Sequence, residues 1–159
     1  MLNKTVKIIG ILFLIGITIL VVLFYRFSKP KSDEKIKAYF TENGIVVSIK
    51  QEVFQNFKYR LLATQKEIDT TQPNIVFIHG SIGSAFDFKN YLVDKDLNSN
   101  ANLIAYDRIG YGMNQTGDVQ ESIAFEVEML SDITKNFITE NTILVGYSYG
   151  GPIALASLK

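Results

Sequence analysis

Hydrophobic residues are distributed very unevenly along this chain. From Ile8 to Tyr25 the sequence reads IIGILFLIGITILVVLFY, with no charged side chain and with Thr18 as the one polar residue inside the run. A helix of this length rises roughly 27 Å, close to the hydrocarbon thickness of a bilayer. The run is apolar on all sides, whereas a helix packed on a soluble core is apolar on one side. The pattern therefore predicts a transmembrane anchor within residues 1–27.

Two questions about this anchor stay open at the level of sequence. A cleaved signal peptide has an apolar core of about 7 to 15 residues that ends at small residues. The segment FYRFSKPK offers no such site, which favours an uncleaved, single-pass anchor. Lysine and arginine are more numerous after the run than before it, which favours a cytoplasmic domain. An exported domain remains an alternative, so the side of the membrane is undecided.

Residues 28–43 follow the anchor and are rich in charge. Because they contain Pro30 and several lysines, they predict a solvated linker that starts a short helix. Two strand-like runs come next, Ile45 to Lys50 and Val53 to Ala63. Their partial alternation predicts that Phe54, Tyr59 and Leu61 point inward.

The rest of the chain, within a domain expected over residues 44–159, alternates short apolar runs with helical patterns. The runs NIVFIHG, ANLIAYD and TILVGYS predict buried strands. A helix is expected from Ala85 to Val93 with Ser84 as its N-cap. A second, longer helix is expected behind a capping box of Asp118 and Glu121. Its apolar stripe consists of Ile123, Val127, Leu130, Ile133 and Phe137. The alternation predicts the α/β class, with a mostly parallel sheet and helices on both faces.

Composition removes several classes of function. The sequence holds 16 lysine and arginine residues against 16 aspartate and glutamate residues, so nothing suggests a nucleic-acid partner. It has no cysteine and one histidine, His79. Cysteine-ligated metals, histidine-rich metal sites and thiolate nucleophiles are therefore excluded, and no cofactor or metal is predicted. Oligomeric state cannot be read from these features.

The first chemistry-bearing motif is Gly146-Tyr147-Ser148-Tyr149-Gly150. A serine at the tip of a tight strand-to-helix turn needs small residues two positions before and after it, and glycine occupies both. The turn exposes the Ser148 hydroxyl and directs the Tyr149 N–H from the helix start toward the same point. The motif predicts a nucleophile and one donor of an oxyanion hole.

Two further loops follow strands of the same predicted sheet. In His79-Gly80-Ser81 the glycine lets the chain bend, so that the Ser81 N–H becomes the second oxyanion donor. His79 is expected to brace this loop by hydrogen bonding rather than to act as the base. Because the carboxyl ends of parallel strands meet at one edge, the two loops should lie close together.

The third loop is Asp107-Arg108-Ile109-Gly110-Tyr111-Gly112. Gly110 and Gly112 permit backbone angles that other residues resist, and Asp107 with Arg108 can hold neighbouring loops by charge-assisted hydrogen bonds. We expect a structural role here rather than a direct catalytic one.

Together, IVFIHGSIGS, LIAYDRIGYG and ILVGYSYGGPIAL resemble the α/β-hydrolase superfamily, in the group with a histidine-glycine oxyanion loop. The resemblance covers roughly Gly44 to Leu158. It implies Ser148 as nucleophile, with the N–H groups of Ser81 and Tyr149 as the oxyanion hole. A serine at this position implies a small-molecule ester, amide or related acyl substrate, because members that displace halide or open epoxides carry aspartate there.

In this superfamily the acid and the histidine follow the nucleophile. The sequence contains no aspartate, glutamate or histidine after Ser148. The resemblance therefore predicts the N-terminal half of a longer hydrolase, with an open apolar edge at TILVGYS and a poorly covered helix after it. The alternative is a non-catalytic, truncated module or a fragment that needs a partner chain.

Overall fold

A computed structural model describes residues 3–65, 67–114, 119–120, 122–135, 137 and 141–158. The chain divides into two compact units, Met1–Pro30 and Lys31–Lys159. The first unit is the helix α1 (Lys4–Ser28), in which Lys4–Arg26 is long and apolar enough to cross a membrane. At its start, the Asn3 side chain accepts a hydrogen bond from the Thr5 N–H. The apolar run at the N-terminus therefore forms the long helix that the sequence predicts.

Within the described residues of the second unit, five strands form one mixed sheet in the order β1-β2-β4-β3-β5. The strands are β1 (Ser48–Phe54), β2 (Phe57–Ala63), β3 (Asn74–Ile78), β4 (Asn102–Tyr106) and β5 (Thr142–Gly146). β4, β3 and β5 run parallel to one another, whereas β2 is antiparallel to both β1 and β4. The parallel part carries the three loops that follow β3, β4 and β5.

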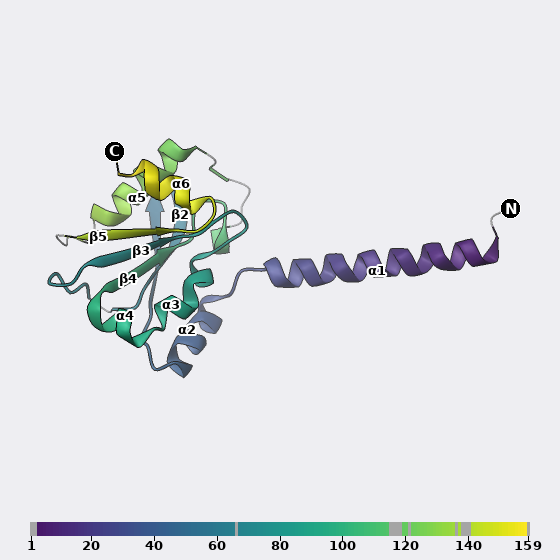
Figure 1. The fold of residues 1–159 in the computed structure, drawn as a ribbon, viewed down its shortest axis with the longest axis horizontal. Coiled ribbons are helices and arrows are strands. Elements are labelled where there is room, and N and C mark those ends of the chain that lie inside the picture. The colour runs from purple at the N-terminus through teal and green to yellow at the C-terminus, as the bar shows by residue number, and fades with distance from the viewer. Residues whose placement is uncertain are drawn as a thin grey trace. The chain divides into compact units, whose positions relative to one another are not determined.

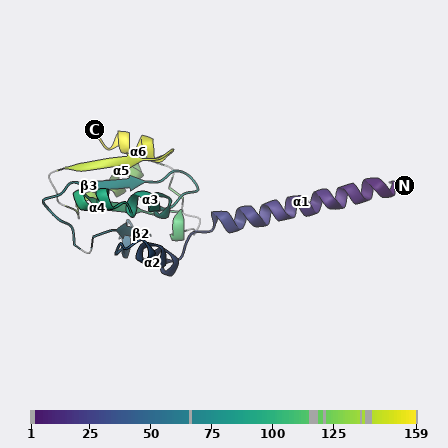
Figure 2. The ribbon, with the colours of Figure 1, turned by 60° about the horizontal axis from the view of Figure 1, so that its bottom comes forward.

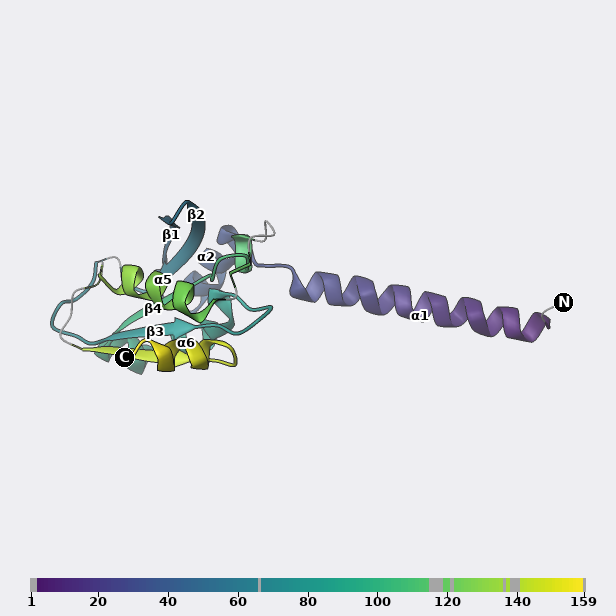
Figure 3. The same ribbon diagram turned by 90° about the horizontal axis from the view of Figure 1, so that it is seen from above.

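The hairpin of β1 and β2 corrects one expectation. The break between the two strands lies at Gln55 and Asn56, not before Val53. Both turn residues have positive φ, 45° and 70°, as a two-residue hairpin turn of type I′ requires, and asparagine tolerates this conformation. The hairpin projects from the sheet in Figure 3. Its inward residues Phe54, Tyr59 and Leu61 all belong to one apolar cluster, as predicted.

Two apolar clusters lie on opposite faces of the sheet, because side chains alternate along each strand. In β3, Val76 and Ile78 join the cluster beneath α5 and α6, whereas Phe77 joins the other. α5 (Ile123–Lys135) and α6 (Gly150–Ala156) cover one face, and α2 (Asp33–Glu42), α3 (Lys89–Leu92) and α4 (Lys95–Asn100) cover the other (Figure 1). The predicted architecture, a mostly parallel sheet with helices on both faces, is confirmed.

The expected linker, residues 28–43, differs from the prediction over most of its length. Residues 33–42 form α2, and the side chains of Ile36 and Phe40 are fully buried in the second cluster. The two residues are four apart and so share one helix face, although charged residues surround them in the sequence. This segment is part of the packed domain and not a solvated linker.

The remaining helices follow the prediction in part. The stretch from Ala85 to Val93 is a 3-10 turn, η1 (Ala85–Phe88), that continues into α3; Ser84 precedes it, and its N–H donates to the Asp87 carboxylate at 3.0 Å. α4 was not predicted; its N-cap Asp94 accepts from the Leu97 N–H at 2.9 Å. The predicted capping box of residues 118 and 121 lies outside the described residues.

The edge strand β5 leaves apolar side chains exposed. Figure 2 shows β5 at the margin of the sheet with α6 beside it. Ile143 is 50% exposed and Leu155 on α6 is 69% exposed. The sequence predicts this open edge and the sparse cover of α6.

Candidate active site

The turn between β5 and α6 holds Ser148 in an unusual backbone conformation. Its φ is 51°, in the left-handed region that non-glycine residues rarely occupy, and its side chain is exposed. The turn is closed by hydrogen bonds from the Gly150 N–H to the Tyr147 carbonyl at 2.9 Å and from the Gly151 N–H to the Ser148 carbonyl at 3.0 Å. Such local strain concentrates at functional sites.

Both glycines that flank Ser148 are required by close backbone contacts. A Cβ on Gly146 would overlap the carbonyl of Gly150, and a Cβ on Gly150 would overlap the carbonyl of Ile78 at the end of β3. The strand-to-helix turn is therefore packed against itself and against the neighbouring strand. This arrangement is the sharp elbow that the G-x-S-x-G spacing predicts.

The histidine-glycine loop after β3 lies directly beside Ser148. A Cβ on Gly80 would stand 2.8 Å from the Ser148 Cβ and 3.3 Å from its Oγ. The Tyr147 N–H also donates to the Ile78 carbonyl at 3.0 Å, which ties the two loops together. Ser81 follows Gly80 in an exposed turn, and Tyr149 is the partly buried residue that precedes α6. The structure thus brings the predicted oxyanion loop and the predicted nucleophile to one place.

His79 is buried and has a hydrogen-bond partner on each ring nitrogen. Its Nδ1 lies 2.7 Å from the Gly80 carbonyl oxygen, and its Nε2 accepts from the Arg108 N–H at 2.9 Å. Since Nε2 is an acceptor, the proton is on Nδ1, which donates to Gly80. Burial lowers the pKa of His79 to about 4, helped by the nearby Arg108 charge. This geometry is that of a brace, as the sequence predicts, and leaves no nitrogen free to serve Ser148.

Asp107, at the end of β4, connects three other segments. Its fully buried carboxylate accepts from the Ala85 N–H at 2.8 Å and the Met113 N–H at 3.1 Å, and it lies 2.9 Å from the Arg60 guanidinium of β2. Burial raises the pKa of Asp107, and Arg60 opposes that rise. A Cβ on Gly112, whose φ is 58°, would overlap the carboxylate. These contacts are the loop-holding role expected for Asp107.

Arg108 is also buried, with its guanidinium in a polar and aromatic setting. Its Nε donates to Glu126 Oε1 of α5 at 2.8 Å. The guanidinium carbon lies 4.7 Å from the centre of the Tyr111 ring and 4.6 Å from that of Tyr149. Burial raises the pKa of Glu126, although the pairing with Arg108 opposes the shift. Gly110, the remaining glycine of this loop, has φ 80° and packs against Val119.

Sequence reasoning missed two charged partners of this site, Arg60 and Glu126. Glu126 precedes Leu130 by four residues and Ile133 by seven, so it lies on the buried face of α5. A charged residue on an apolar face was a signal that a buried pair exists there. Arg60 lies in β2 between the inward-facing Tyr59 and Leu61, on the opposite face, where no sequence feature indicates its partner.

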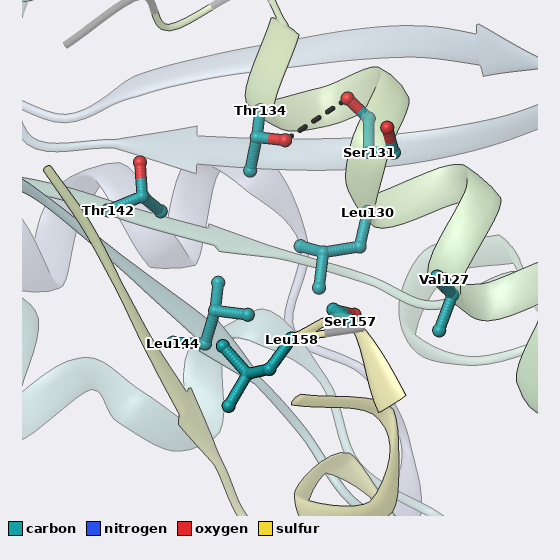
Figure 4. Close-up of a pocket in the computed structure, with 8 residues that line it drawn as sticks. All are labelled: Val127, Leu130, Ser131, Thr134, Thr142, Leu144, Ser157 and Leu158. Carbon is teal, nitrogen blue, oxygen red and sulfur yellow. Dashed lines mark hydrogen bonds between the residues drawn. The ribbon is translucent and has the colours of Figure 1, made fainter. Parts of the chain in front are cut away.

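A cavity elsewhere in the domain is separate from these loops. It has a volume of about 360 Å³ and lies between α5, β5 and the end of α6 (Figure 4). Leu130, Leu144 and Leu158 point into it, and Thr142 places it at the amino end of β5, opposite the Ser148 end. Among the described residues no group of three or more histidine, aspartate or glutamate side chains is placed to hold a metal ion.

The described domain has the fold of the α/β-hydrolase class: parallel strands whose carboxyl ends carry a strained serine elbow and a glycine loop. The family model described as "Alpha/beta hydrolase family" matches residues 75–159, more than half of the chain. The chain therefore belongs to the alpha/beta hydrolase family.

Known proteins similar to this chain are considerably longer than it. The chain is 26% identical over 123 residues to a proline iminopeptidase of Saccharolobus solfataricus, a match that covers 74% of this chain and 39% of the relative. A membrane phospholipase A described as a bacterial virulence factor matches 97% of this chain and 47% of its own, at a TM-score of 0.64 and 16% identity. A loop variant of a haloalkane dehalogenase from Bradyrhizobium elkanii matches 68% of this chain and 34% of its own, at a TM-score of 0.55 and 19% identity. At these identities the two structures show the fold alone.

Proposed function

We propose that this protein is a membrane-anchored serine hydrolase that acts on an ester, amide or related acyl substrate. Ser148 is the nucleophile in this proposal, and the N–H groups of Ser81 and Tyr149 are the oxyanion donors. The observation that carries the proposal is the contact between the two loops: Ser148 has a left-handed φ, and its Oγ would stand 3.3 Å from a Cβ on Gly80.

The chemistry requires donors on one side of the serine and a base on the other. A carbonyl attacked by Ser148 develops negative charge on its oxygen, which N–H groups at a helix start and in an adjacent loop can stabilise. Serine supports acyl chemistry, in agreement with the name of the proline iminopeptidase among the similar proteins.

A general base is the component that the proposal requires from beyond these 159 residues. His79 is the one histidine of the sequence, and both of its nitrogens are engaged. Loss of a triad member typically removes several powers of ten in rate. In the proposed mechanism, a histidine and an acid from further residues of the protein or from a partner chain would complete the site.

The membrane part of the proposal is supported by α1, which is apolar over Lys4–Arg26. The match to the membrane phospholipase A extends over 97% of the chain and so includes residues of α1. A test is carbonate extraction of membranes from cells that express the protein. The protein should stay in the pellet, and release of an intact or N-terminally shortened chain would contradict the anchor.

Labelling with a fluorophosphonate probe tests the nucleophile. The probe should label the protein in membranes from cells that express it, and the Ser148→Ala variant should stay unlabelled. Labelling that persists in Ser148→Ala would refute the assignment of Ser148.

The engagement of His79 favours a second candidate function, a non-catalytic module that binds a partner chain. In that case neither form is labelled, and the protein is instead recovered in a complex of defined stoichiometry. If a partner supplies the base, labelling should depend on the presence of both chains.

A further inference from the structure

Arg108 has contacts that loop stability alone does not explain. Its side chain is 1% exposed and its partner Glu126 is fully buried. Burial of two charges is costly, and an apolar pair of similar volume is often at least as stable. A buried ion pair at this position therefore indicates a role in geometry rather than in stability.

The guanidinium joins the helix α5 to the nucleophile turn. Glu126 orients it from α5 through the 2.8 Å hydrogen bond to Nε. The Tyr149 ring then lies against it at 4.6 Å, and the Tyr111 ring at 4.7 Å. A planar guanidinium that stacks on an aromatic ring restricts the ring far more than a lysine ammonium does.

Tyr149 is the residue between Ser148 and the first residue of α6. The Tyr149 ring is partly buried against Arg108, so displacement of the guanidinium would let the ring shift, and with it the backbone at the start of α6. A shift of this backbone would change the direction of the Tyr149 N–H. Donors to an oxyanion act through their preorganised direction, so a small change in angle matters.

We propose that Arg108 is a positioning residue that, held by Glu126, orients the Tyr149 N–H toward the oxyanion formed at Ser148. This inference rests on the proposed function and assigns a residue that the nucleophile motif does not contain. Arg108 does not touch the reacting atoms and acts through Tyr149.

The test uses the full-length protein in detergent, with the further residues or the partner chain that supply the base. It compares the wild type with Arg108→Lys and Glu126→Gln. Asn102→Ser is the control, because Asn102 is fully buried and donates to Asn74 at 3.0 Å at the amino ends of β4 and β3, opposite the end that carries Ser148. The readouts are kcat and KM for p-nitrophenyl butyrate and the Ki of a trifluoromethyl ketone.

The ketone reports on the oxyanion hole directly. Ser148 Oγ adds to the carbonyl carbon, its proton passes to the base, and the ketone oxygen becomes an anion that the N–H groups must bind. Loss of one donor typically costs about 10²- to 10³-fold. We expect Arg108→Lys to lower kcat and raise Ki by about 10- to 100-fold with KM nearly constant, and Glu126→Gln to act in the same direction more weakly.

The possible results separate this inference from the proposed function. A wild type that the fluorophosphonate does not label removes the proposed function itself. Wild-type labelling combined with unchanged kcat and Ki in Arg108→Lys overturns the inference alone, as does a rise confined to KM. Equal shifts in Asn102→Ser also overturn it, because they would reflect general loosening of the domain. If Arg108→Lys does not fold, the milder Glu126→Gln variant decides.

Discussion

Two adjacent glycines at the start of α6 provide a matched pair of substitutions. Both belong to the helix, so an alanine is compatible with the backbone at either position. A Cβ on Gly150 would overlap the carbonyl of Ile78, whereas a Cβ on Gly151 would meet no atom within 4 Å. The close approach of the helix start to β3 therefore requires glycine at position 150 but not at position 151.

The expected magnitudes follow from these two environments. In a helix, alanine is favoured over glycine by up to about 1 kcal/mol, and by less in the first turn. Gly151→Ala should therefore stabilise the domain by about 0.5 kcal/mol. Gly150→Ala gains the same amount but forces apart two backbone segments, and overpacking of this kind costs about 1–3 kcal/mol or more. Because the equal gains cancel, the two variants should differ by roughly 1–3 kcal/mol or more in the free energy of unfolding.

Thermal unfolding of the detergent-solubilised chain measures this difference. For a domain of this size, 1 kcal/mol shifts Tm by about 3–5 °C. We expect Gly151→Ala to melt slightly above the wild type and Gly150→Ala to melt about 3–15 °C below Gly151→Ala. Equal melting temperatures would refute the reasoning, because they would mean that α6 does not approach β3 as closely as the structure indicates.

Three further predictions concern single residues. Ser148→Gly should be more stable than Ser148→Ala by about 1 kcal/mol, because glycine relieves the left-handed φ and alanine does not; equal unfolding midpoints in urea would contradict the strain. Burial lowers the pKa of His79 to about 4 from an ordinary value near 6.5, so between these pH values the unfolded chain binds a proton that the folded chain excludes. The free energy of unfolding should therefore fall by up to roughly 3 kcal/mol as the pH drops from about 6.5 to about 4. The difference in unfolding free energy between the wild type and His79→Asn, measured across that range, isolates this residue from the buried carboxylates, and a difference that does not change with pH would oppose the prediction. Tyr106→Phe should leave stability unchanged or raise it by about 1 kcal/mol, because the hydroxyl is buried without a hydrogen-bond partner among the described residues; a lower Tm would show that the hydroxyl is bonded.

Much of the fold could be predicted because its signals are local. The strands β3, β4 and β5 are short apolar runs followed by glycine-rich turns, and such runs form buried parallel strands. The elbow at Ser148 was also predictable, since the glycine spacing that it needs lies within five consecutive residues. In each case the cause and the result lie in the same stretch of chain.

Other features depended on contacts between distant segments. α2 fully buries Ile36 and Phe40, and its Tyr39 ring packs against Phe86 of η1, so its burial follows from the surface that it meets and not from its own pattern. The hairpin turn at Gln55 and Asn56 goes with the register of β1 on β2, in which Phe54 pairs with Phe57. The partial alternation in the sequence placed the break between the strands too early, before Val53. Local pattern cannot decide either, because both depend on which segments meet in space.

The sequence by itself determined the α/β class, the apolar N-terminal helix and the glycine-flanked Ser148, because each is encoded by neighbouring residues. Only the tertiary structure decided that His79 is engaged on both nitrogens and that Arg108 pairs with Glu126 and lies against Tyr149. Those partners are separated by up to 41 positions, Arg108 from Tyr149, and their distances follow from the packing of α5 and the loops at the end of the sheet. Hydrogen bonds and ring contacts act over a few ångströms, and the folded chain alone brings such residues that close.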